Sequence, residues 1–490
     1  TASGEAWSGE RLSPTRATPA TMRIALVGCG HGELDSIYAS VAQIEAVHQT
    51  TVDLLLICGD FQAVRNQSDL ATMACPAKYR SMQDFHRYYS GEKRAPVLTI
   101  FIGGNHEASS HLWELYYGGW VAPNIYFLGY AGVVSVGGVR IGGLSGIYNG
   151  RHYHTGHCEA PPYSDSDMRS AYHVREIEVL RLLQLRQPMD VFLSHDWPAH
   201  IATMGDTNAL LRKKSFLRDE VRDGSLGSPA GEQLLKHLKP DYWFAAHLHV
   251  KFAAVVQHAA GASATRFLSL DKCLPQRDFM QASHRPPEPR PLSPSHLSPS
   301  PPQPCAPGLL SARRRPPQLI TVDGDGSPPV LRYDAEWIAV LRSTAHLFSN
   351  RRGRVPLDPQ AVGRASGGRA DFGPSEEELS SVLEAAGGDL AVPLDFAVTA
   401  PPYQHGDPPA AQPHFAESPQ TAAFARTFGL PAEFRSQAGG TSGPAVRDGR
   451  GLHGVDGGLC LPVPPPPPTT AADGVFAPLP VDEEIDLGDD

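Results

Sequence analysis

Five apolar stretches of the sequence each end in side chains that can bind a metal ion. Each stretch has the length and composition of a buried β-strand. Ligands gather at the carboxyl ends of the strands in an open α/β sheet, so we interpret the five endings as parts of one convergent site. In chain order the endings are Gly28-Cys29-Gly30-His31-Gly32, Cys58-Gly59-Asp60, Gly103-Gly104-Asn105-His106-Glu107, Ser194-His195 and Ala246-His247-Leu248-His249.

The residue types at these endings suit two neighbouring cations. Asp60 can give one carboxylate oxygen to each of two ions, and Asn105 offers a neutral carbonyl oxygen. Two cations about 3.5–4 Å apart, bridged by a carboxylate, activate water for in-line displacement at phosphorus. The remaining donors are His195 and His247 beside Asn105, and Cys29, His31 and His249 for a second pocket.

Each of these signals is weak when it is taken alone. A single Gly-Asp pair carries no information, and a single histidine more often packs or faces solvent than binds a metal. His247 and His249 alternate, which would place both imidazoles on one face of a strand. The order of all five endings makes a purely structural role a matter of roughly a few per cent. A metal centre is therefore the favoured interpretation.

The elements between these endings predict an α/β fold with two packed sheets. Strand-like stretches without intervening helices follow position 120, and a Gly-Gly turn flanked by apolar alternation predicts a hairpin over Val133–Ile141. Apolar residues at helical spacing predict helices over Asp35–Val47, Tyr79–Tyr89 and Val174–Leu185. Later helices are predicted over Tyr333–Phe348, Pro374–Ala386 and Thr421–Phe428.

The composition of the 490 residues predicts folded and unfolded parts. An apolar content of 41% supports a sizeable core, whereas 47 Gly and 46 Pro indicate long unstructured stretches. We expect residues 1–21 to be a disordered extension without the apolar core of a signal peptide, with the natural start at Met22. Residues 283–318 are predicted to be a Pro/Ser-rich linker or insertion, and residues 432–490 a disordered acidic tail.

Charge and cysteine content narrow the functional classes. The net charge of −10 argues against binding of nucleic acid by bulk charge, but six of the acidic residues lie in the last nine positions. Seven unevenly spaced cysteines do not form a disulfide framework, which favours a reducing compartment. No run of 18 apolar residues exists, so no transmembrane helix and no membrane partner are expected.

The order of the five endings resembles the calcineurin-like metallophosphoesterases. That superfamily usually has Asp at the position of Cys29 and Gly at the position of Ala246, and the cysteine is characteristic of one branch, the RNA lariat debranching enzymes. The resemblance is dense over residues 22–274 and looser over 319–431. Further matching motifs are Gly59–Asn66, Tyr88–Lys93, Tyr117–Tyr126, Ser194–Pro198, Ala246–Phe252, Tyr333–Trp337 and Pro419–Thr421.

The resemblance implies a fold and a set of roles. It implies a metallophosphoesterase-like β-sandwich flanked by helices over residues 22–282, with a lariat-recognition loop at about 145–175, and a smaller C-terminal domain over 319–431. His106 would be the general acid beside the phosphate. One metal would be held by Cys29, His31, Asp60 and His249, and the other by Asp60, Asn105, His195 and His247.

The same resemblance implies hydrolysis of the 2′-5′ phosphodiester at the branch point of an excised intron lariat. The thiolate of Cys29 favours softer ions, so Fe²⁺ and Zn²⁺ are expected, with Mn²⁺ able to substitute. The expected partner is branched RNA and not DNA, with protein partners for the Pro-rich acidic tail. A nuclear location is expected, although Leu211–Ser215 and Arg313–Arg315 are weak nuclear signals.

Alternative functions stay open at this point. The chain could be a nuclease or phosphatase of the same superfamily that acts on another substrate, or a metal-loaded scaffold that binds RNA or protein without turnover. The His-rich segment Arg151–Cys158 has a metal-like composition but lies in a loop bounded by Gly and Pro, away from any predicted strand end. We interpret this segment as solvated or substrate-facing rather than as a third metal site.

Overall fold

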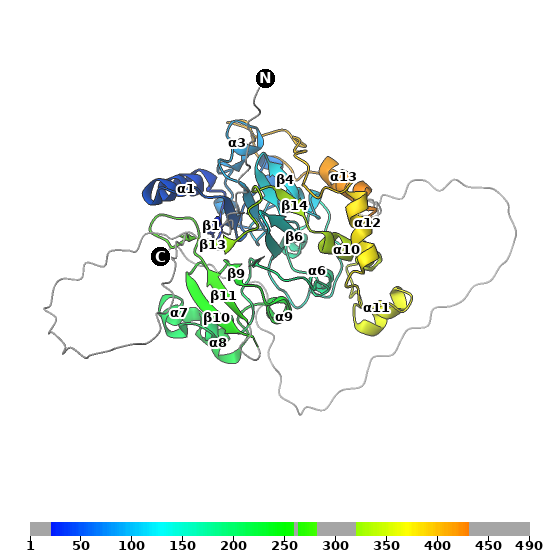
Figure 1. Ribbon diagram of the computed structural model, residues 1–490. Helices are drawn as coiled ribbons and strands as arrows, with labels where there is room; N and C mark the ends of the chain where they lie inside the picture. The colour runs from blue at the N-terminus through cyan, green and yellow to red at the C-terminus, as the bar shows by residue number, and fades with distance from the viewer. Residues whose placement is uncertain (1–20, 259–262, 282–319, 431–490) are drawn as a thin grey trace, which may run out of the picture. The chain divides into compact units, whose positions relative to one another are not determined.

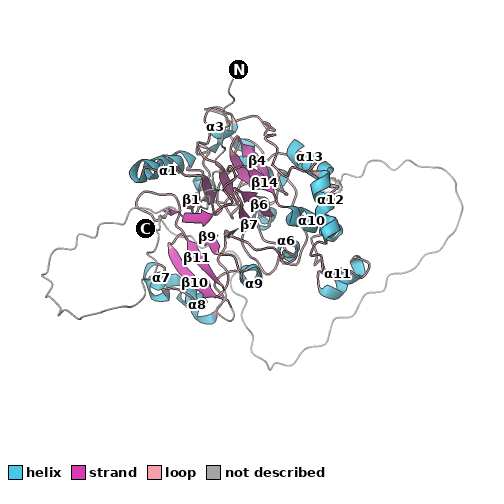
Figure 2. Cartoon of the chain, in the orientation of Figure 1, coloured by secondary structure: helices cyan, strands magenta, loops and turns pink. Residues whose placement is uncertain are grey.

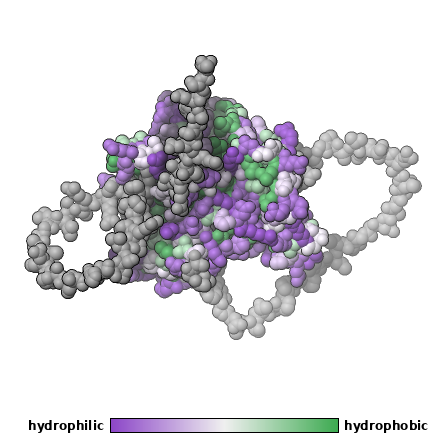
Figure 3. Space-filling model, viewed as in Figure 1, coloured by the Kyte–Doolittle hydropathy of each residue, from purple (hydrophilic) through white to green (hydrophobic). Residues whose placement is uncertain are grey.

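The computed structural model describes residues 21–258, 263–281 and 320–430 (Figure 1). The predicted extension up to residue 20, the linker at 283–318 and the tail at 432–490 lie outside the described residues. All described residues fall in one compact unit. Among them, no helix is both long and apolar enough to cross a membrane. Hydrophilic side chains cover most of the described surface on the face shown in Figure 3.

The fold is built on two mixed sheets of seven strands each (Figure 2). In the first sheet the order is β12-β1-β2-β3-β5-β4, with β13 also paired to β1. Strands β1, β2, β3 and β5 run parallel, so their carboxyl ends share one edge. The bounds are β1 Thr21–Val27, β2 Leu54–Ile57, β3 Thr99–Phe101, β4 Gly119–Ala122, β5 Ile125–Phe127, β12 Met280–Gln281 and β13 Ile320–Asp323.

The second sheet has the order β10-β11-β9-β8-β7-β6-β14. Its strands β7, β8, β9 and β11 are parallel, and β6 and β7 form the predicted hairpin. The bounds are β6 Ala131–Val136, β7 Val139–Leu144, β8 Val191–Ser194, β9 Tyr242–Ala245, β10 Phe252–Gln257, β11 Ala264–Ser269 and β14 Leu331–Tyr333.

The two sheets pack face to face, as predicted. Successive residues of a strand point to opposite faces, and Ile24 and Leu26 of β1 pack in one apolar cluster with Val191 and Leu193 of β8. Their neighbours Ala25 and Val27 instead belong to a second cluster, which includes residues of α1, α6 and α9. The protein is therefore a β-sandwich whose outer faces carry helices.

The helices flank this sandwich on several sides (Figure 1). The bounds up to residue 182 are α1 Leu34–His48, α2 Gln67–Leu70, α3 Phe85–Tyr89, α4 Ser109–Glu114, α5 Asp165–Ser170 and α6 Glu176–Leu182. They continue with α7 Thr207–Lys213, α8 Arg218–Asp223, α9 Pro229–Leu238, α10 Ala335–Thr344, α11 Pro359–Ala365, α12 Glu376–Ala385 and α13 Pro419–Phe428. Helices α10, α12 and α13 lie together on one flank.

The helix predicted over Tyr79–Tyr89 is wrong in its first half, because only α3 at Phe85–Tyr89 is α-helical. The side chain of Asp84 instead caps a different helix, since its carboxylate accepts hydrogen bonds from the backbone N–H groups of Leu34 (3.0 Å) and Asp35 (2.7 Å). These are orphan donors at the start of α1, whose own Glu33 makes no side-chain cap. A helix running through Asp84 would lose this long-range cap.

The segment from residue 320 onward contributes one strand to each sheet. β13 pairs antiparallel with β1, and β14 pairs antiparallel with β6. Arg140 on β7 donates to Asp334 (2.8 Å) and Glu336 (2.7 Å) at the start of α10. The two predicted domains thus share sheets and buried ion pairs, and the boundaries at 282 and 319 stay predictions.

Candidate metal centre

Both sheets deliver the predicted ligands. Cys29 and His31 follow β1, Asp60 follows β2, and Asn105 follows β3, whereas His195 follows β8 and the two later histidines follow β9. The centre therefore bridges the carboxyl edges of two sheets, rather than lying at the edge of one open sheet. Because the sandwich holds these edges together, residues more than 200 positions apart meet.

The backbone at the centre is unusual. His31, Asp60, His247 and His249 all have positive φ, with values of 46°, 46°, 62° and 46°. Such left-handed conformations cost non-glycine residues about 1–3 kcal/mol each and persist at functional sites. The expectation that His247 and His249 share one face of a strand is wrong, because β9 ends at Ala245 and both residues have a left-handed backbone beyond it. Nδ1 of His247 contacts Asn105, whereas Nε2 of His249 contacts His31.

Two glycines let the loops approach each other. A Cβ on Gly59, whose φ is +105°, would lie 2.3 Å from Nδ1 of His195. A Cβ on Gly104 would lie 2.2 Å from Oδ1 of Asp60. Real side-chain contacts do not come this close, so any larger residue at either position would push a candidate ligand out of place.

The first group of donors is formed by Cys29, His31, Asp60 and His249. One candidate ligand atom from each lies within 4.8 Å of all the others. Nε2 of His31 lies 3.3 Å from Nε2 of His249 and 3.6 Å from Oδ2 of Asp60. A thiol, two imidazoles and a carboxylate in this space match the donors that bind Zn²⁺ or Fe²⁺.

The second group is centred on the amide oxygen of Asn105. This Oδ1 lies 3.1 Å from Nε2 of His195 and 3.1 Å from Nδ1 of His247. Oδ1 of Asp60 lies 3.3 Å from the same Nε2 of His195. Asp60 therefore directs one carboxylate oxygen to each group, which is the geometry that a ligand shared by two cations requires.

The protonation of His195 tests whether this arrangement suits a cation. Its Nδ1 lies 2.7 Å from the carbonyl oxygen of Cys58, which can only accept, so Nδ1 carries a proton. In the neutral ring Nε2 then holds a lone pair, and it faces the oxygens of Asp60 and Asn105. Three lone pairs at these distances repel one another unless a positive charge lies among them. Burial alone would lower the pKa of His195, but Asp60 raises it, so a proton on Nε2 supplies this charge in the metal-free protein and a bound cation would replace that proton. The residues therefore fit a metal ion.

Burial sets the protonation of the other donors. It lowers the pKa of His31 to about 4, of His247 to about 3 and of His249 to about 2, which leaves these imidazoles neutral and free to bind a metal. Burial, followed by the charge of Asp60, raises the pKa of the Cys29 thiol well above its usual value. Burial alone would also raise the pKa of Asp60, but His195 and His106 hold it well below the usual range.

His106 is placed differently from its neighbour Asn105. Its backbone N–H donates to Oδ1 of Asp60 (2.9 Å), and its half-buried ring lies 5.9 Å from the ring of His31, centroid to centroid. The ring thus borders the first group of donors, but His106 is not one of the four residues in that group.

Glu107 is a positioning residue for which the sequence alone indicated no role. Its buried carboxylate accepts hydrogen bonds from the N–H groups of Phe61 (2.8 Å), Gln62 (2.8 Å) and Gly104 (2.9 Å). These bonds tie the loop after β2 to the loop after β3, and so fix Asp60 relative to Asn105. The only signal in the sequence was the position of Glu107 directly after the Gly-Asn-His motif.

The expected recognition loop is a packed segment that includes α5. It begins directly after β7, which is parallel to β8, whereas its His-rich part, Arg151–Cys158, starts seven residues beyond the end of that strand. Arg175 is fully buried and donates to Glu159 (2.7 Å), and His157 is buried against Glu178 (2.8 Å). These side chains hold the segment together, whereas Arg151 is exposed.

Comparisons with known proteins agree with this geometry. The family model described as calcineurin-like phosphoesterase matches residues 22–251, and the model described as lariat debranching enzyme, C-terminal domain, matches residues 262–433. The first match contains all seven candidate ligands and His106. The second begins before the predicted linker and ends just beyond the last described helix.

Curated relatives cover most of the chain. A lariat debranching enzyme of Danio rerio is 50% identical over 84% of this chain and 66% of its own length. The Homo sapiens enzyme of that name is 50% identical over 84% of this chain and 69% of its own, and the Arabidopsis thaliana enzyme is 44% identical over 84% and 87%. The chain spans about two thirds of the length of these vertebrate relatives. It belongs to the lariat debranching enzyme family of calcineurin-like phosphoesterases.

Proposed function

We propose that this chain hydrolyses the 2′-5′ phosphodiester bond at the branch point of lariat RNA. The observation that carries the proposal is the pair of donor groups that share Asp60, with a thiol in the first group. Membership of the lariat debranching family supports the choice of substrate. The product would be a linear RNA and a free 5′-phosphate end.

The roles of the residues follow from their placement. Cys29, His31, Asp60 and His249 would hold one divalent cation, and Asp60, Asn105, His195 and His247 the other. When bound, the cations supply charge to the phosphate and lower the pKa of water. Fe²⁺ and Zn²⁺ suit a site with a thiolate, and Mn²⁺ would substitute.

His106 is proposed as the general acid. Its ring borders the first donor group but is not part of it, so it can reach a phosphate held over the centre. A departing 2′-oxygen is a poor leaving group as an alkoxide, and an imidazolium that protonates it lowers the barrier. Glu107 and the Cys58 carbonyl do not touch the substrate; they orient Asp60 and His195.

The test is the cleavage of a synthetic 2′-5′ branched RNA beside its 3′-5′ linear isomer. We expect the metal-loaded protein to cut the branched bond and to leave the isomer intact. Equal cleavage of both would favour a general nuclease of the superfamily. Binding of branched RNA without cleavage, with Fe²⁺, Zn²⁺ and Mn²⁺ supplied in turn, would favour a scaffold.

A nuclear location is part of the same proposal, because branched RNA arises during splicing. Arg212 and Lys213 are exposed at the end of α7, as a nuclear signal requires. The second basic run, Arg313–Arg315, lies outside the described residues. A fluorescent fusion in which Arg212 and Lys213 are both replaced by alanine tests this point. We expect this variant to accumulate less in the nucleus than the unaltered fusion.

A further inference from the structure

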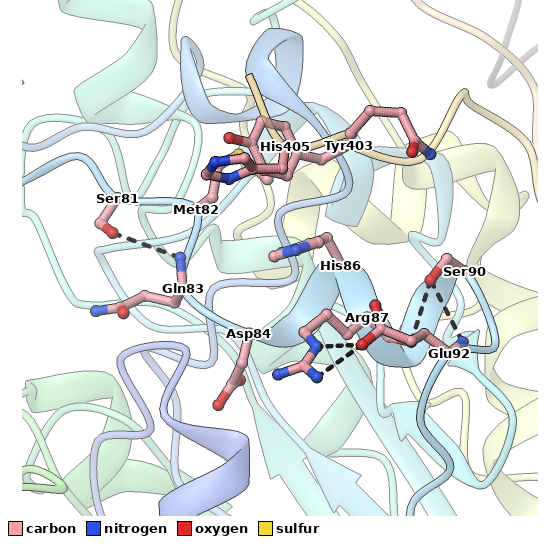
Figure 4. Close-up of a pocket in the computed structure, with 11 residues that line it drawn as sticks. Ser81, Met82, Gln83, Asp84, His86, Arg87, Ser90, Glu92, Tyr403 and His405 are labelled. Atoms are coloured by element: carbon pink, nitrogen blue, oxygen red, sulfur yellow. Dashed lines mark hydrogen bonds and ion pairs between the residues drawn. The ribbon is translucent and has the colours of Figure 1, made fainter. Parts of the chain in front are cut away.

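A pocket of about 670 Å³ lies beside the metal centre (Figure 4). One side is formed by residues 81–92, around α3, and the other by residues 403–405. Pockets of 300–1,000 Å³ are typical of sites for small organic groups such as a nucleotide. None of the proposed metal ligands lines it, so it needs a separate explanation.

The second side of this pocket belongs to residues 399–405, which we call the C-terminal strap. The hydroxyl of Tyr89 accepts hydrogen bonds from the N–H groups of Thr399 (2.7 Å) and Ala400 (2.8 Å). The N–H of Tyr403 donates to the carbonyl of Arg65 (2.9 Å). The strap is thus fixed by backbone hydrogen bonds although it lies more than 300 positions from these partners, and the side chain of Tyr403 is left to face the pocket.

The pocket begins one residue from the metal centre. A Cβ on Gly32 would lie 2.7 Å from the Cβ of Gln83, which lines the pocket, and Gly32 directly follows His31. Consecutive Cα atoms are about 3.8 Å apart. The pocket therefore adjoins the loop that carries His31, so a nucleotide bound there would be a neighbour of one whose phosphate is held at the donors.

The chemistry of the walls favours a base over a phosphate. The ring of His86 points into the space between Tyr403 and His405 on one side and Arg87 on the other (Figure 4). Its centroid lies 5.0 Å from that of Tyr403. Arg87 is already paired with Glu92 (2.6 Å) and Asp35 (3.4 Å), so no free cation is offered to a phosphate by this arginine.

We propose that this pocket takes an unpaired base of the branched RNA, from a nucleotide next to the branch point, with Tyr403 as its stacking partner. The inference rests on the proposed function, since the RNA must be held at the donors for the pocket to be occupied. Unpaired RNA bases are recognised by stacking on aromatic and histidine rings and by hydrogen bonds to their edges. Gln83 supplies a polar group at the opposite side.

The test uses the full chain and a labelled branched RNA that carries a non-hydrolysable phosphonate at the 2′-5′ linkage. Loss of a stacked base costs about 1–3 kcal/mol, so Tyr403→Ala should raise the dissociation constant by about 5- to 150-fold. Tyr403→Phe is the matched control, because it keeps the ring, and it should bind like the unaltered protein. Hydrolysis of bis-p-nitrophenyl phosphate should be unchanged in both variants.

A second arm locates the base. In a second set of probes, one nucleotide next to the branch point lacks its base. The probe that lacks the base held in the pocket should bind the unaltered protein and Tyr403→Ala equally well, whereas the probes abasic at other positions should still bind Tyr403→Ala more weakly. Equal binding by Tyr403→Ala and the unaltered protein with every intact probe would overturn the inference. Parallel loss of RNA binding and of bis-p-nitrophenyl phosphate hydrolysis would also overturn it, because the strap would then be structural. Since binding is measured without cleavage, failure of branch hydrolysis would refute the proposed function alone.

Discussion

Two histidine-rich regions of this protein have similar composition and opposite electrostatics. At the metal centre, the buried donors of Asp60, Asn105 and His195 turn lone pairs toward one another. In residues 145–175 and the adjoining α6, buried charged groups form ion pairs, as in Arg175–Glu159 and His157–Glu178. The first region gathers more acceptors around Asp60 than its own donors satisfy, which suits a cation, whereas the second is held by ion pairs between its own side chains.

Amino-acid composition alone does not distinguish these two regions. Clusters of His, Cys and acidic residues occur in both places, so residue type does not identify a metal site. A cation is favoured where buried acceptors outnumber the donors, and disfavoured where ion pairs already satisfy them. The following changes test this contrast between the two regions.

The largest effect should come from Asp60→Ala. Loss of the carboxylate shared by both donor groups should remove bound metal and lower phosphodiesterase activity by at least about 10³-fold, because the cations contribute several kcal/mol to the transition state. Metal analysis and kinetics would measure both. Glu176→Gln, which removes the carboxylate partner of His154 in the other region, is the matched control and should keep the metal. Retention of two metals by Asp60→Ala would contradict the assignment of the shared ligand.

His106→Ala should separate chemistry from metal binding. We expect both metals to remain while turnover of branched RNA falls by about 10²–10⁴-fold, the usual contribution of a general acid. The defect should shrink on a nitrophenyl ester, whose leaving group needs no proton. The same loss on both substrates, or loss of metal, would show that His106 is not the acid.

Arg175→Ala should affect stability and not metal content. Its removal leaves the buried carboxylate of Glu159 without its ion-pair partner, which costs about 3–5 kcal/mol in the free energy of unfolding. Urea unfolding of the metal-free chain would measure the change. Arg151→Ala, at an exposed arginine of the same segment, should change the stability by less than about 0.5 kcal/mol. Similar values for the two variants would mean that the segment is not held by its buried pairs.

The smallest expected effect is the pH dependence of metal affinity. Because burial and Asp60 raise the pKa of Cys29, the thiol is protonated near pH 7 in the metal-free chain, and metal binding must release this proton. Affinity at the first donor group should therefore rise about tenfold per pH unit from about pH 6 to 8. The two histidines of this donor group add nothing in this window, since the pKa of His31 is about 4 and that of His249 about 2.

Cys29→Asp should abolish this dependence, because an aspartate is already ionised at these pH values. Calorimetry in two buffers of different ionisation enthalpy would count the released protons. Release of one proton by both proteins would mean that the proton comes from a group other than the Cys29 thiol.

The strand endings were predictable because a buried strand leaves a clear apolar stretch, and its carboxyl end has a fixed place in a sheet. The packing of two sheets was also predictable, from strands without helices between them. The left-handed backbone at Asp60 and His249 was not, because strain is stored by tertiary contacts. Glu107, Asp84 and the strap at Tyr403 were missed for the same reason: each acts on backbone groups far away in the sequence.

We propose that the donors around Asp60 form a two-cation centre that cleaves the branch. The most direct measurement is the rate of 2′-5′ cleavage by chelator-treated protein as Fe²⁺, Zn²⁺ or Mn²⁺ is added back in known amounts. We predict no cleavage without metal and a rate that levels off at two equivalents per chain. Full activity of the metal-free protein, or a plateau at one equivalent, would contradict it.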